Sequence, residues 1–578
     1  MECMYLQVNM LQIRKLYSDP TVFDAIPFLP GVNLILGEPS EGSAKTNGVG
    51  KSIAIEFLNF ALLSKYSSSR VKKIPKVVVP LDVEICVDLL IGRQEVTIKR
   101  KRGEENRPAI LVNGDLFEFS KLEDAQSFLG NLLFEGSEAT HPSFRSMLGV
   151  LLRDERSEFK SIINGYDTTL KISDDYAPHL YLLGVNISSY KKIKVLQKEA
   201  SDLRQKVKEY EKSVMLLRQK KIDDTRADLN ELDAEVSIIE QDIENLENTA
   251  SYDALEAEMQ ELDESILERR RQSAIVLDKI SRLEPIEAER VEISTDELSE
   301  YYNDLKAGLG DLVAKDFDEL KAFKAKIYRF QNEVLRKRRD SLERSLKEVK
   351  DALRVMDKEY QKKLRLLDQG GALKALKQTF ATYQEKADQL ADLRSFITGH
   401  DGAVSQRREK LLEKDTEVQR LQVNIDQANR IKLSFEGTIL DIHNFVMGNR
   451  QAAIHVETVD KAQVVDITLR IDSDGSHSVE REKTFIYDFS LLTNELTGER
   501  HFGLLVHDNI FEVDSDTLKR SLGFIAQHAP ALQGQYILTL NSDRASSDAP
   551  DAMNALASSV RARFTKQSRF LKKKYQED

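Results

Sequence analysis

Residues 37–52 read GEPSEGSAKTNGVGKS, and this stretch decides the fold. Its last six residues, Asn47 to Ser52, supply the parts of a phosphate-binding loop: glycines that let the backbone approach, a lysine for the phosphates and a serine for Mg²⁺. The usual loop, G-x-x-x-x-G-K-[ST], has a glycine five residues before Gly50, where this chain has Lys45. The stretch is therefore either a phosphate loop that carries an insertion or a chance GKS.

The sequences on either side of this stretch favour a true phosphate loop. GVNLILG, residues 31–37, is a short apolar run typical of a buried strand, and SIAIEFLNFALL, residues 52–63, predicts a helix. A strand, a glycine-rich loop and a helix are the context that such a loop requires. We predict that the following residues bind ATP, with the Ser52 hydroxyl as a ligand of Mg²⁺: Gly37, Asn47, Gly48, Val49, Gly50, Lys51 and Ser52.

The second half of such a site is an apolar strand that ends in an aspartate. FGLLVHDNIF, residues 502–511, provides one, and we predict that Asp508 holds Mg²⁺ and serves the reaction. A further apolar strand, QYILTLNSD, ends near Asn541, which we expect to face the γ-phosphate. A buried strand with an aspartate at its turn is the alternative for Asp508.

The composition indicates more than one structural unit and long, solvated helices. The 578 residues exceed what one core usually organises, 31% are charged, and there is no Trp. A net charge of -12 argues against a chain that coats nucleic acid along its whole surface. Cys3 and Cys86 form no zinc spacing, and no run of about 18 apolar residues occurs. We expect a cytoplasmic protein that does not span a membrane.

Apolar residues recur at heptad spacing in two tracts between residues 187 and 446. The outgoing seam consists of Leu196, Ala200, Leu203, Val207, Tyr210, Val214 and Leu217. Pro285, Gly308 and Gly310 interrupt the pattern, and a second seam resumes at Leu342. Two tracts around a non-heptad centre predict an antiparallel coiled-coil hairpin, and a parallel dimeric coiled coil is the alternative.

The expected domains follow from these changes of pattern. They are an N-terminal lobe (1–186), an outgoing helix (187–285), an apex (286–325), returning helices (326–446) and a C-terminal lobe (447–578). In the first lobe, residues 94–115 predict a β-hairpin with a charged tip. In the last lobe, VVDITLRIDSDGSHSVEREKTFIYDF predicts two strands joined by a DSDG turn.

A phosphate loop in the first lobe and its aspartate in the last, separated by a long coiled hairpin, resembles the SMC-like branch of the ABC ATPases. There the loop is usually GxNGxGKS, whereas nine residues, EPSEGSAKT, stand here between Gly37 and Asn47. The segments GEPSEGSAKTNGVGKS, LYLLGVN, LLVHDNIFE and YILTLNSD are specifically similar to the YydD-like family of bacterial SMC-like ATPases. The opening stretch is thus a phosphate loop with an insertion.

The resemblance implies a split α/β head that binds ATP and Mg²⁺ and closes as a homodimer around the nucleotide. The signature LSGGE is absent, and we expect Ser490, in YDFSLL, to open a helix and contact ATP, with an ordinary N-cap as the alternative. Asn509 stands where these ATPases usually have a glutamate, and an amide cannot take a proton. Hydrolysis is then slow, or Glu512 or Asp514 is the base. No convincing glutamine loop occurs, and RDER, residues 153–156, lies near its place.

Two basic stretches could neutralise phosphates of DNA. The first consists of Lys99, Arg100, Lys101 and Arg102, and the second of Arg561, Arg563, Lys566, Arg569, Lys572, Lys573 and Lys574. A solvated surface or a frayed tail is the alternative for each.

The leading hypothesis for function is an ATP-gated dimeric clamp or sensor on nucleic acid or partner proteins. The resemblance adds a role in bacterial anti-phage or mobile-element defence with separate effector subunits. The alternative is a nucleotide-binding coiled-coil scaffold with little hydrolysis that tethers an effector. A purely structural coiled-coil protein would leave the phosphate loop without a role.

Overall fold

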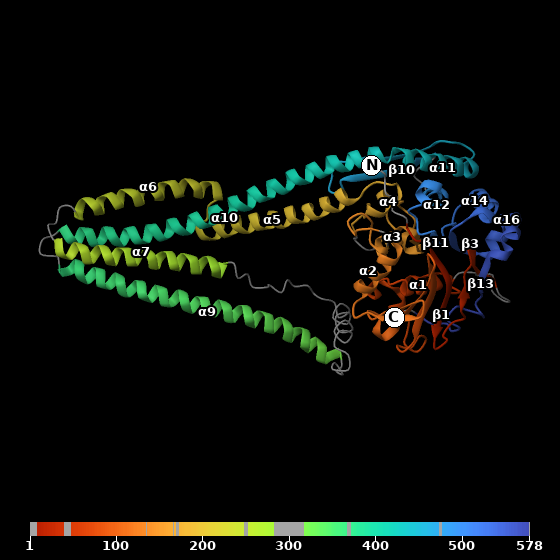
Figure 1. Ribbon diagram of the computed structural model, residues 1–578, viewed down its shortest axis with the longest axis horizontal. Helices are drawn as coiled ribbons and strands as arrows, with labels where there is room; N and C mark the ends of the chain where they lie inside the picture. The colour runs from red at the N-terminus through yellow and green to blue at the C-terminus, as the bar shows by residue number, and fades with distance from the viewer. Residues whose placement is uncertain are drawn as a thin grey trace. The chain divides into compact units, whose positions relative to one another are not determined.

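The computed structural model of the chain is shown in Figure 1. It describes residues 8–39, 48–134, 136–165, 167–168, 173–247, 253–281, 317–366, 372–472 and 477–576. The chain forms two compact units. We call the first the head, which contains the described parts of 1–194 and 415–578, and the second the arm, which contains those of 195–281 and 317–414.

A parallel five-stranded sheet forms the centre of the head. Its strands, in spatial order, are β13 (Val560–Phe564), β3 (Gly31–Gly37), β12 (Gln535–Asn541), β11 (Leu504–Asp508) and β8 (Leu152–Arg153). The strand predicted before the phosphate loop is β3, and all seven of its residues are buried. Because β3 lies between two strands from the other end of the chain, neither lobe builds this sheet alone.

A second, antiparallel sheet is built from the N-terminal lobe only. Its strands, in spatial order, are β2 (Ile26–Pro27), β1 (Leu11–Asp19), β4 (Glu84–Ile91), β5 (Gln94–Lys101), β6 (Ala109–Val112) and β7 (Asp115–Glu118). The predicted hairpin is the antiparallel pair β5 and β6. Helix α1 (Lys51–Ala61) contacts β4 of this sheet and β3 of the parallel sheet, so it joins the two.

The remaining helices of the head lie around these sheets. They are α2 (Leu122–Leu133), α3 (Phe144–Leu151), α4 (Ala177–Leu182), α11 (Asn429–Met447), α12 (His477–Thr493), α13 (Glu495–Gly498), α14 (Ser515–His528), α15 (Ser542–Asp548) and α16 (Pro550–Ala555). One predicted strand is wrong: β9 (Ala452–Thr458) pairs with β10 (Val465–Ile471), but the residues after the DSDG turn form α12. A short buried apolar run does not distinguish a strand from a helix, and here the segment is 17 residues long.

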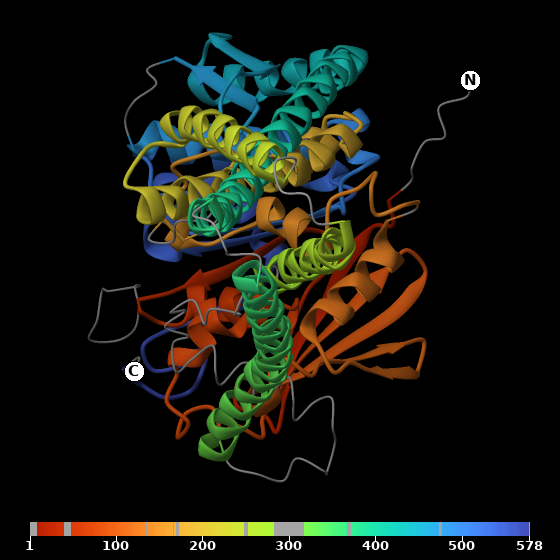
Figure 2. The same ribbon diagram turned by 90° about the vertical axis from the view of Figure 1, so that its left-hand side faces the viewer.

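The arm consists of long helices that pair antiparallel. They are α5 (Ser188–Arg218), α6 (Ile222–Glu247), α7 (Asp253–Ser281), α9 (Phe317–Leu366) and α10 (Ala372–Gln427), of which α5 begins and α10 ends in the head. Residue numbers rise on one side as they fall on the other in its ion pairs, Glu199–Lys410, Asp233–Arg394 and Glu258–Lys363. Helices α7 and α9 lie side by side in both views (Figures 1 and 2). The predicted antiparallel hairpin is therefore confirmed over the parallel alternative.

The predicted seam of the outgoing tract is the buried side of its helix. Leu196 and Val214 are almost fully buried, whereas Leu216, off the seam, is exposed. Most of the predicted apex lies outside the described residues, and α9 begins within it at Phe317. Among the described helices, none combines the length and the apolar character needed to cross a membrane.

Candidate nucleotide-binding site

The phosphate loop ends at the first residue of α1. Strand β3 ends at Gly37, residues 40–47 with Asn47 lie outside the described residues, and α1 begins at Lys51. Gly48 and Gly50 have φ values of +74° and +110°, a region that glycine adopts without steric cost. The backbone N–H groups at the start of α1 have no partner within the helix and form a site that attracts phosphate.

Lys51 contacts a residue from the opposite end of the chain. Its Nζ donates a hydrogen bond to Oδ1 of Asn541, which ends β12 next to Gly37 of β3. Lys51 is only 6% exposed, and this burial lowers the pKa of its ammonium, although the carboxylates of Asp508 and Glu155 oppose the shift. A buried lysine at this edge of the sheet is poised to exchange an amide partner for the phosphates of a nucleotide.

Asp508 ends β11, one strand farther along the same edge. It is 1% exposed and accepts a 2.7 Å hydrogen bond from Thr539 through Oδ1. Among the described residues, its Oδ2 has no hydrogen-bond partner. Burial raises the pKa of Asp508 to about 6, and the charges of Glu155 and Asp154 add to this shift. A buried carboxylate oxygen without a partner, beside a loop that carries the Ser52 hydroxyl, fits Mg²⁺.

The sequence analysis missed Glu155, which follows β8 at the same edge of the sheet. Its Oε2 lies 3.5 Å from Oγ of Ser52, and its Oε1 lies 3.4 Å from Nδ2 of Asn509. The carboxylate therefore lies between the predicted Mg²⁺ ligand and the residue that replaces the usual glutamate. The sequence RDER, residues 153–156, lies near the expected position of the glutamine loop, and its glutamate is the residue that reaches the site.

The two candidate bases after Asn509 have different surroundings. Glu512 accepts a 2.6 Å hydrogen bond from Nδ2 of Asn509 and pairs with Arg481 at 3.0 Å. Asp514 instead caps α14, where it accepts hydrogen bonds from the amide and the hydroxyl of Thr517. Asp514 therefore serves the helix rather than the site, a correction to its predicted role, and it illustrates the preference of aspartate for N-caps.

Ser490 does not open a helix, and this prediction is wrong. Helix α12 begins at His477, so Ser490 lies near its C-terminal end, where it is 0% exposed. Its hydroxyl has no hydrogen-bond partner among the described residues. The apolar residues around Ser490 belong to the buried face of a longer helix, and the sequence pattern alone did not reveal where that helix starts.

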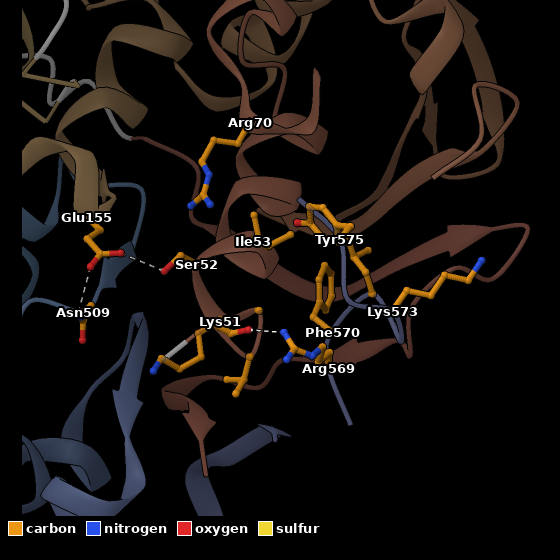
Figure 3. Close-up of a pocket in the computed structure, with 14 residues that line it drawn as sticks. Lys51, Ser52, Ile53, Arg70, Glu155, Asn509, Arg569, Phe570, Lys573 and Tyr575 are labelled. Atoms are coloured by element: carbon orange, nitrogen blue, oxygen red, sulfur yellow. Dashed lines mark hydrogen bonds between the residues drawn. The ribbon is translucent and has the colours of Figure 1, made fainter. Parts of the chain in front are cut away.

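Of the predicted site residues, the loop residues 48–52 and Asn509 line one cavity of about 380 Å³ (Figure 3), whereas Asp508 and Asn541 are not part of its lining. Glu155, Ser52 and Asn509 lie together on one side of the close-up. On the other side lie residues from the C-terminal end of the chain, namely Arg569, Phe570, Lys573 and Tyr575. Arg70 also lines the cavity. The cavity thus has an acidic side, with Glu155, and a basic, aromatic side.

A buried charged network within the head supports the ends of the strands that lead to Glu155 and Asp508. Arg153 donates to Asp488 of α12 from Nε at 2.5 Å, and His507 lies 3.0 Å from the same carboxylate. All three side chains are buried. Burial alone would raise the pKa of Asp488, but Arg153 and His507 hold it below its ordinary value. Since Arg153 and His507 shortly precede Glu155 and Asp508, the network fixes both strand ends to α12.

The first basic stretch does not form the continuous DNA contact that was predicted. Arg100 is 0% exposed, and its guanidinium donates to the carbonyls of Phe60, Ser64 and Glu105. Arg102 is also buried and donates to backbone carbonyls. These two arginines hold loops together and cannot reach phosphates, a correction that leaves Lys99 and Lys101 as candidates.

The second basic stretch is mostly engaged within the head. Arg561 donates to Asn33, Arg563 pairs with Glu38, and Lys572 pairs with Asp24. Arg569 donates a 2.8 Å hydrogen bond to the carbonyl of Gly48 in the phosphate loop. Of this predicted DNA contact, Arg569 and Lys573 line the nucleotide cavity instead.

Comparison with known proteins agrees with this division of the site. Residues 13–267, which include the phosphate loop, match the family described as AAA domain. Residues 441–574, which include β11 and β12, match the family described as uncharacterised protein conserved in bacteria (DUF2326). The chain is 20% identical over 573 residues to the uncharacterized protein YydD of Bacillus subtilis (strain 168), covering 93% of this chain and 92% of that protein. The similarity to YydD thus extends over nearly the whole of both chains.

The head is built from two parts of the chain that are far apart in sequence, and the antiparallel helices of the arm stand between them in the sequence. Two solved structures are also similar over most of their length. One is the Smc head domain with a coiled coil and joint from Pyrococcus yayanosii, with 15% identity, a TM-score of 0.34 and coverage of 93% and 94% of the two chains. The other is the Smc head domain with an extended coiled coil, bound to the C-terminal domain of ScpA, from Pyrococcus furiosus, with 10% identity, a TM-score of 0.33 and coverage of 93% and 92%.

Proposed function

We propose that this YydD-like protein is an ATPase that binds Mg²⁺ and ATP in the cavity of its head. The observation that carries the proposal is the convergence of Lys51, Ser52 and Asp508 at one edge of a single parallel sheet. Phosphate loops and aspartates at strand ends bind nucleotide triphosphates through the same arrangement.

Each residue has a defined task in this proposal. Lys51 leaves Asn541 and contacts the β- and γ-phosphates, while the amides at the start of α1 bind the phosphate oxygens. Ser52 and Asp508 would hold Mg²⁺, which, when bound, neutralises charge on the phosphates. Asn541, released from Lys51, is left facing the γ-phosphate.

Glu155 is our candidate for the residue that takes the proton of the attacking water. Asn509 can orient a water but cannot accept its proton, and Glu155 lies 3.4 Å from it. Glu512 is the less suitable base because Arg481 already neutralises its charge. Asn509 thus serves as the orienting residue, and Glu155 supplies the carboxylate that the usual position lacks.

Single-turnover hydrolysis tests these roles. Glu155→Gln should abolish turnover while ATP still binds, whereas Glu512→Gln should reduce it by a smaller factor. Asn509→Ala should also reduce it only in part. Full turnover by Glu155→Gln together with a loss in Glu512→Gln would move the base to Glu512.

The head is further proposed to close as a homodimer around ATP. Because Ser490 is buried, the contact with the partner's nucleotide is assigned to the N-terminus of α12, a helix end that attracts phosphate. Light scattering on Glu155→Gln should show a doubled mass with Mg-ATP and a monomer mass with ADP. The same mass with both nucleotides would refute dimer closure.

We also propose that the arm conveys the state of the heads to a nucleic acid or a partner protein, in a defence system whose effector is a separate subunit. The long antiparallel helices support this proposal because they form a compact unit of their own, separate from the unit that contains the phosphate loop. Phage challenge of cells that carry the intact gene neighbourhood, with wild-type protein or Lys51→Ala, tests it. Equal protection by both proteins would count against an ATP-dependent role.

A scaffold that binds ATP with little hydrolysis remains the second candidate function. The observation that favours it is Asn509 in the position of the usual glutamate. Undetectable turnover in the wild-type protein, with ATP bound and the dimer formed, would establish it.

A further inference from the structure

We propose that residues 565–575, here called the tail segment, form the wall of the ATP site that receives the nucleoside. In this assignment Tyr575 and Ile53 pack against the base, and Arg569 and Lys573 lie near the ribose and the α-phosphate. The inference rests on the proposed binding of ATP, and it assigns the half of the cavity that the phosphate loop does not explain.

The tail segment is attached directly to the phosphate loop. The amide of Phe570 donates a 3.2 Å hydrogen bond to the carbonyl of Val49, and Arg569 donates one of 2.8 Å to the carbonyl of Gly48. Consecutive residues of the tail segment thus bind consecutive residues of the loop.

A buried aromatic cluster anchors this attachment. Phe570 is 1% exposed, and its ring lies 4.5 Å from that of Phe23, 5.4 Å from that of Phe57 and 5.6 Å from that of Phe564. Phe57 belongs to α1, so the cluster joins the tail segment to the helix that follows the loop. Phe570 and Leu571 are buried in the core of the head, residues 572–574 are exposed, and Tyr575 is partly buried against the core again.

Gly50 shows how closely the loop and the tail segment fit. A Cβ atom at Gly50 would lie 2.6 Å from Cβ of Phe570, closer than side-chain atoms approach one another. The glycine is therefore required both for its φ of +110° and for the approach of the tail segment. The shape of the loop depends on a residue from the other end of the chain.

The direction of the nucleotide follows from the two sides of the cavity. Lys51, Ser52 and Asp508 define where the phosphates and Mg²⁺ bind, and Glu155 closes that side. The nucleoside must extend away from them, toward the side lined by Phe570, Lys573 and Tyr575 (Figure 3). No other part of this cavity offers an aromatic ring among the residues that the structure describes.

The chemistry of this side suits a nucleoside phosphate. A planar base packs well between an aromatic ring and an aliphatic side chain, as Tyr575 and Ile53 would provide, and such stacking contributes substantially to affinity. Two cations beside the loop complement the negative charge of the phosphates nearest the ribose. The same two cations were expected to contact DNA, and their place in the cavity assigns them to the nucleotide instead.

The absence of Trp from the sequence allows a direct optical test. Tyr575→Trp places a single tryptophan in the proposed wall, and its emission should be quenched by ATP and ADP but not by inorganic tripolyphosphate. Phe117→Trp, on β7 and outside the cavity lining, is the matched control and should respond to none of the three. Equal responses of the two variants, or a response to tripolyphosphate equal to that to ATP, would overturn the assignment.

Calorimetry on the full chain separates the nucleoside from the phosphates. Tyr575→Ala should weaken ATP binding by about tenfold and leave tripolyphosphate binding within about twofold, since only the base contact is lost. Lys51→Ala should weaken both ligands. If the wild-type protein binds ATP and Tyr575→Ala binds it equally well, the nucleoside wall lies elsewhere while the ATP site stands. If the wild-type protein binds neither ligand, both the proposed function and this inference fail.

Discussion

Nζ of Lys51 donates a hydrogen bond to Oδ1 of Asn541, although 490 residues separate the two in the sequence. Lys51 begins α1, the helix that follows β3, and Asn541 ends β12. Strands β3 and β12 are neighbours in one parallel sheet, where Asn541 pairs in register with Gly37. The two ends of the chain therefore build one site, and the coiled-coil arm is an insertion between the halves of that site. ATP binding, on this account, requires both lobes to be folded together.

Replacement of Asp508 by asparagine should stabilise the nucleotide-free protein at neutral pH. Burial raises the pKa of this carboxyl to about 6, so its ionised form destabilises the folded head above that pH. Asp508→Asn removes the charge and keeps an acceptor for Thr539. We expect a gain on the order of 2–3 kcal/mol at pH 8 that shrinks as the pH falls below 6 and vanishes near 4.

The control for this prediction is Asp514→Ala, which should lower the stability of the head instead of raising it. It removes the N-cap of α14 and should cost about 1 kcal/mol at pH 8. Denaturant unfolding of both variants between pH 4 and pH 8 is the measurement. A stability of Asp508→Asn equal to that of the wild type at pH 8 would show that the ionised form of Asp508 does not destabilise the folded head.

Breaking the buried pair of Arg153 and Asp488 should destabilise the head strongly. Asp488→Ala leaves a fully buried guanidinium without its carboxylate, and such losses cost about 3–5 kcal/mol. The exposed pair of Arg14 and Glu95 offers the comparison, since Glu95→Ala should change stability by less than about 1 kcal/mol. Equal effects in thermal unfolding would mean that the buried network does not support the strand ends.

The order of the strands and helices around the phosphate loop and in the arm could be predicted, because strong local sequence patterns specify these elements. The apolar run before the loop, the glycines and Lys51 specified a strand, a turn and a helix, and the heptad seams specified the arm. Local patterns were also sufficient to predict Asp508 and Asn541 as site residues, because each stands at the end of an apolar run typical of a strand. The parallel sheet then places all these strand ends at one edge.

Other features depended on contacts between distant parts of the chain, which local patterns do not encode. The start of α12 could not be derived from the buried run around Ser490, because strand and helix look alike there. The sequence pattern predicts that Arg100 and Arg102 are exposed charges. In the structure both are buried and donate hydrogen bonds to backbone carbonyls of the surrounding loops. The contact between Phe570 and Gly50 could not be predicted from the sequence either, because it depends on how the C-terminal end of the chain returns to the loop.

The basic stretch on β5 should divide into structural and exposed residues. Arg100→Gln should cost about 2 kcal/mol or more, because it removes the guanidinium that donates to the buried carbonyls of Phe60, Ser64 and Glu105. Lys99→Gln should leave stability unchanged. If the chain binds DNA through Lys99, its log–log salt slope should fall by about one in this variant. An unchanged slope, with binding retained, would exclude Lys99 from the interface.

Calorimetric titration of Mg-ATP into the full chain and into Lys51→Ala tests the central claim most directly. The lysine contributes charge to the phosphates and is not part of an apolar core, so the variant should remain folded by circular dichroism. We predict saturable binding by the wild type and a loss of about a hundredfold in Lys51→Ala, as expected when a charge-assisted contact of about 3 kcal/mol is removed. Equal affinity of the two proteins for Mg-ATP would contradict the assignment of this cavity as the ATP site.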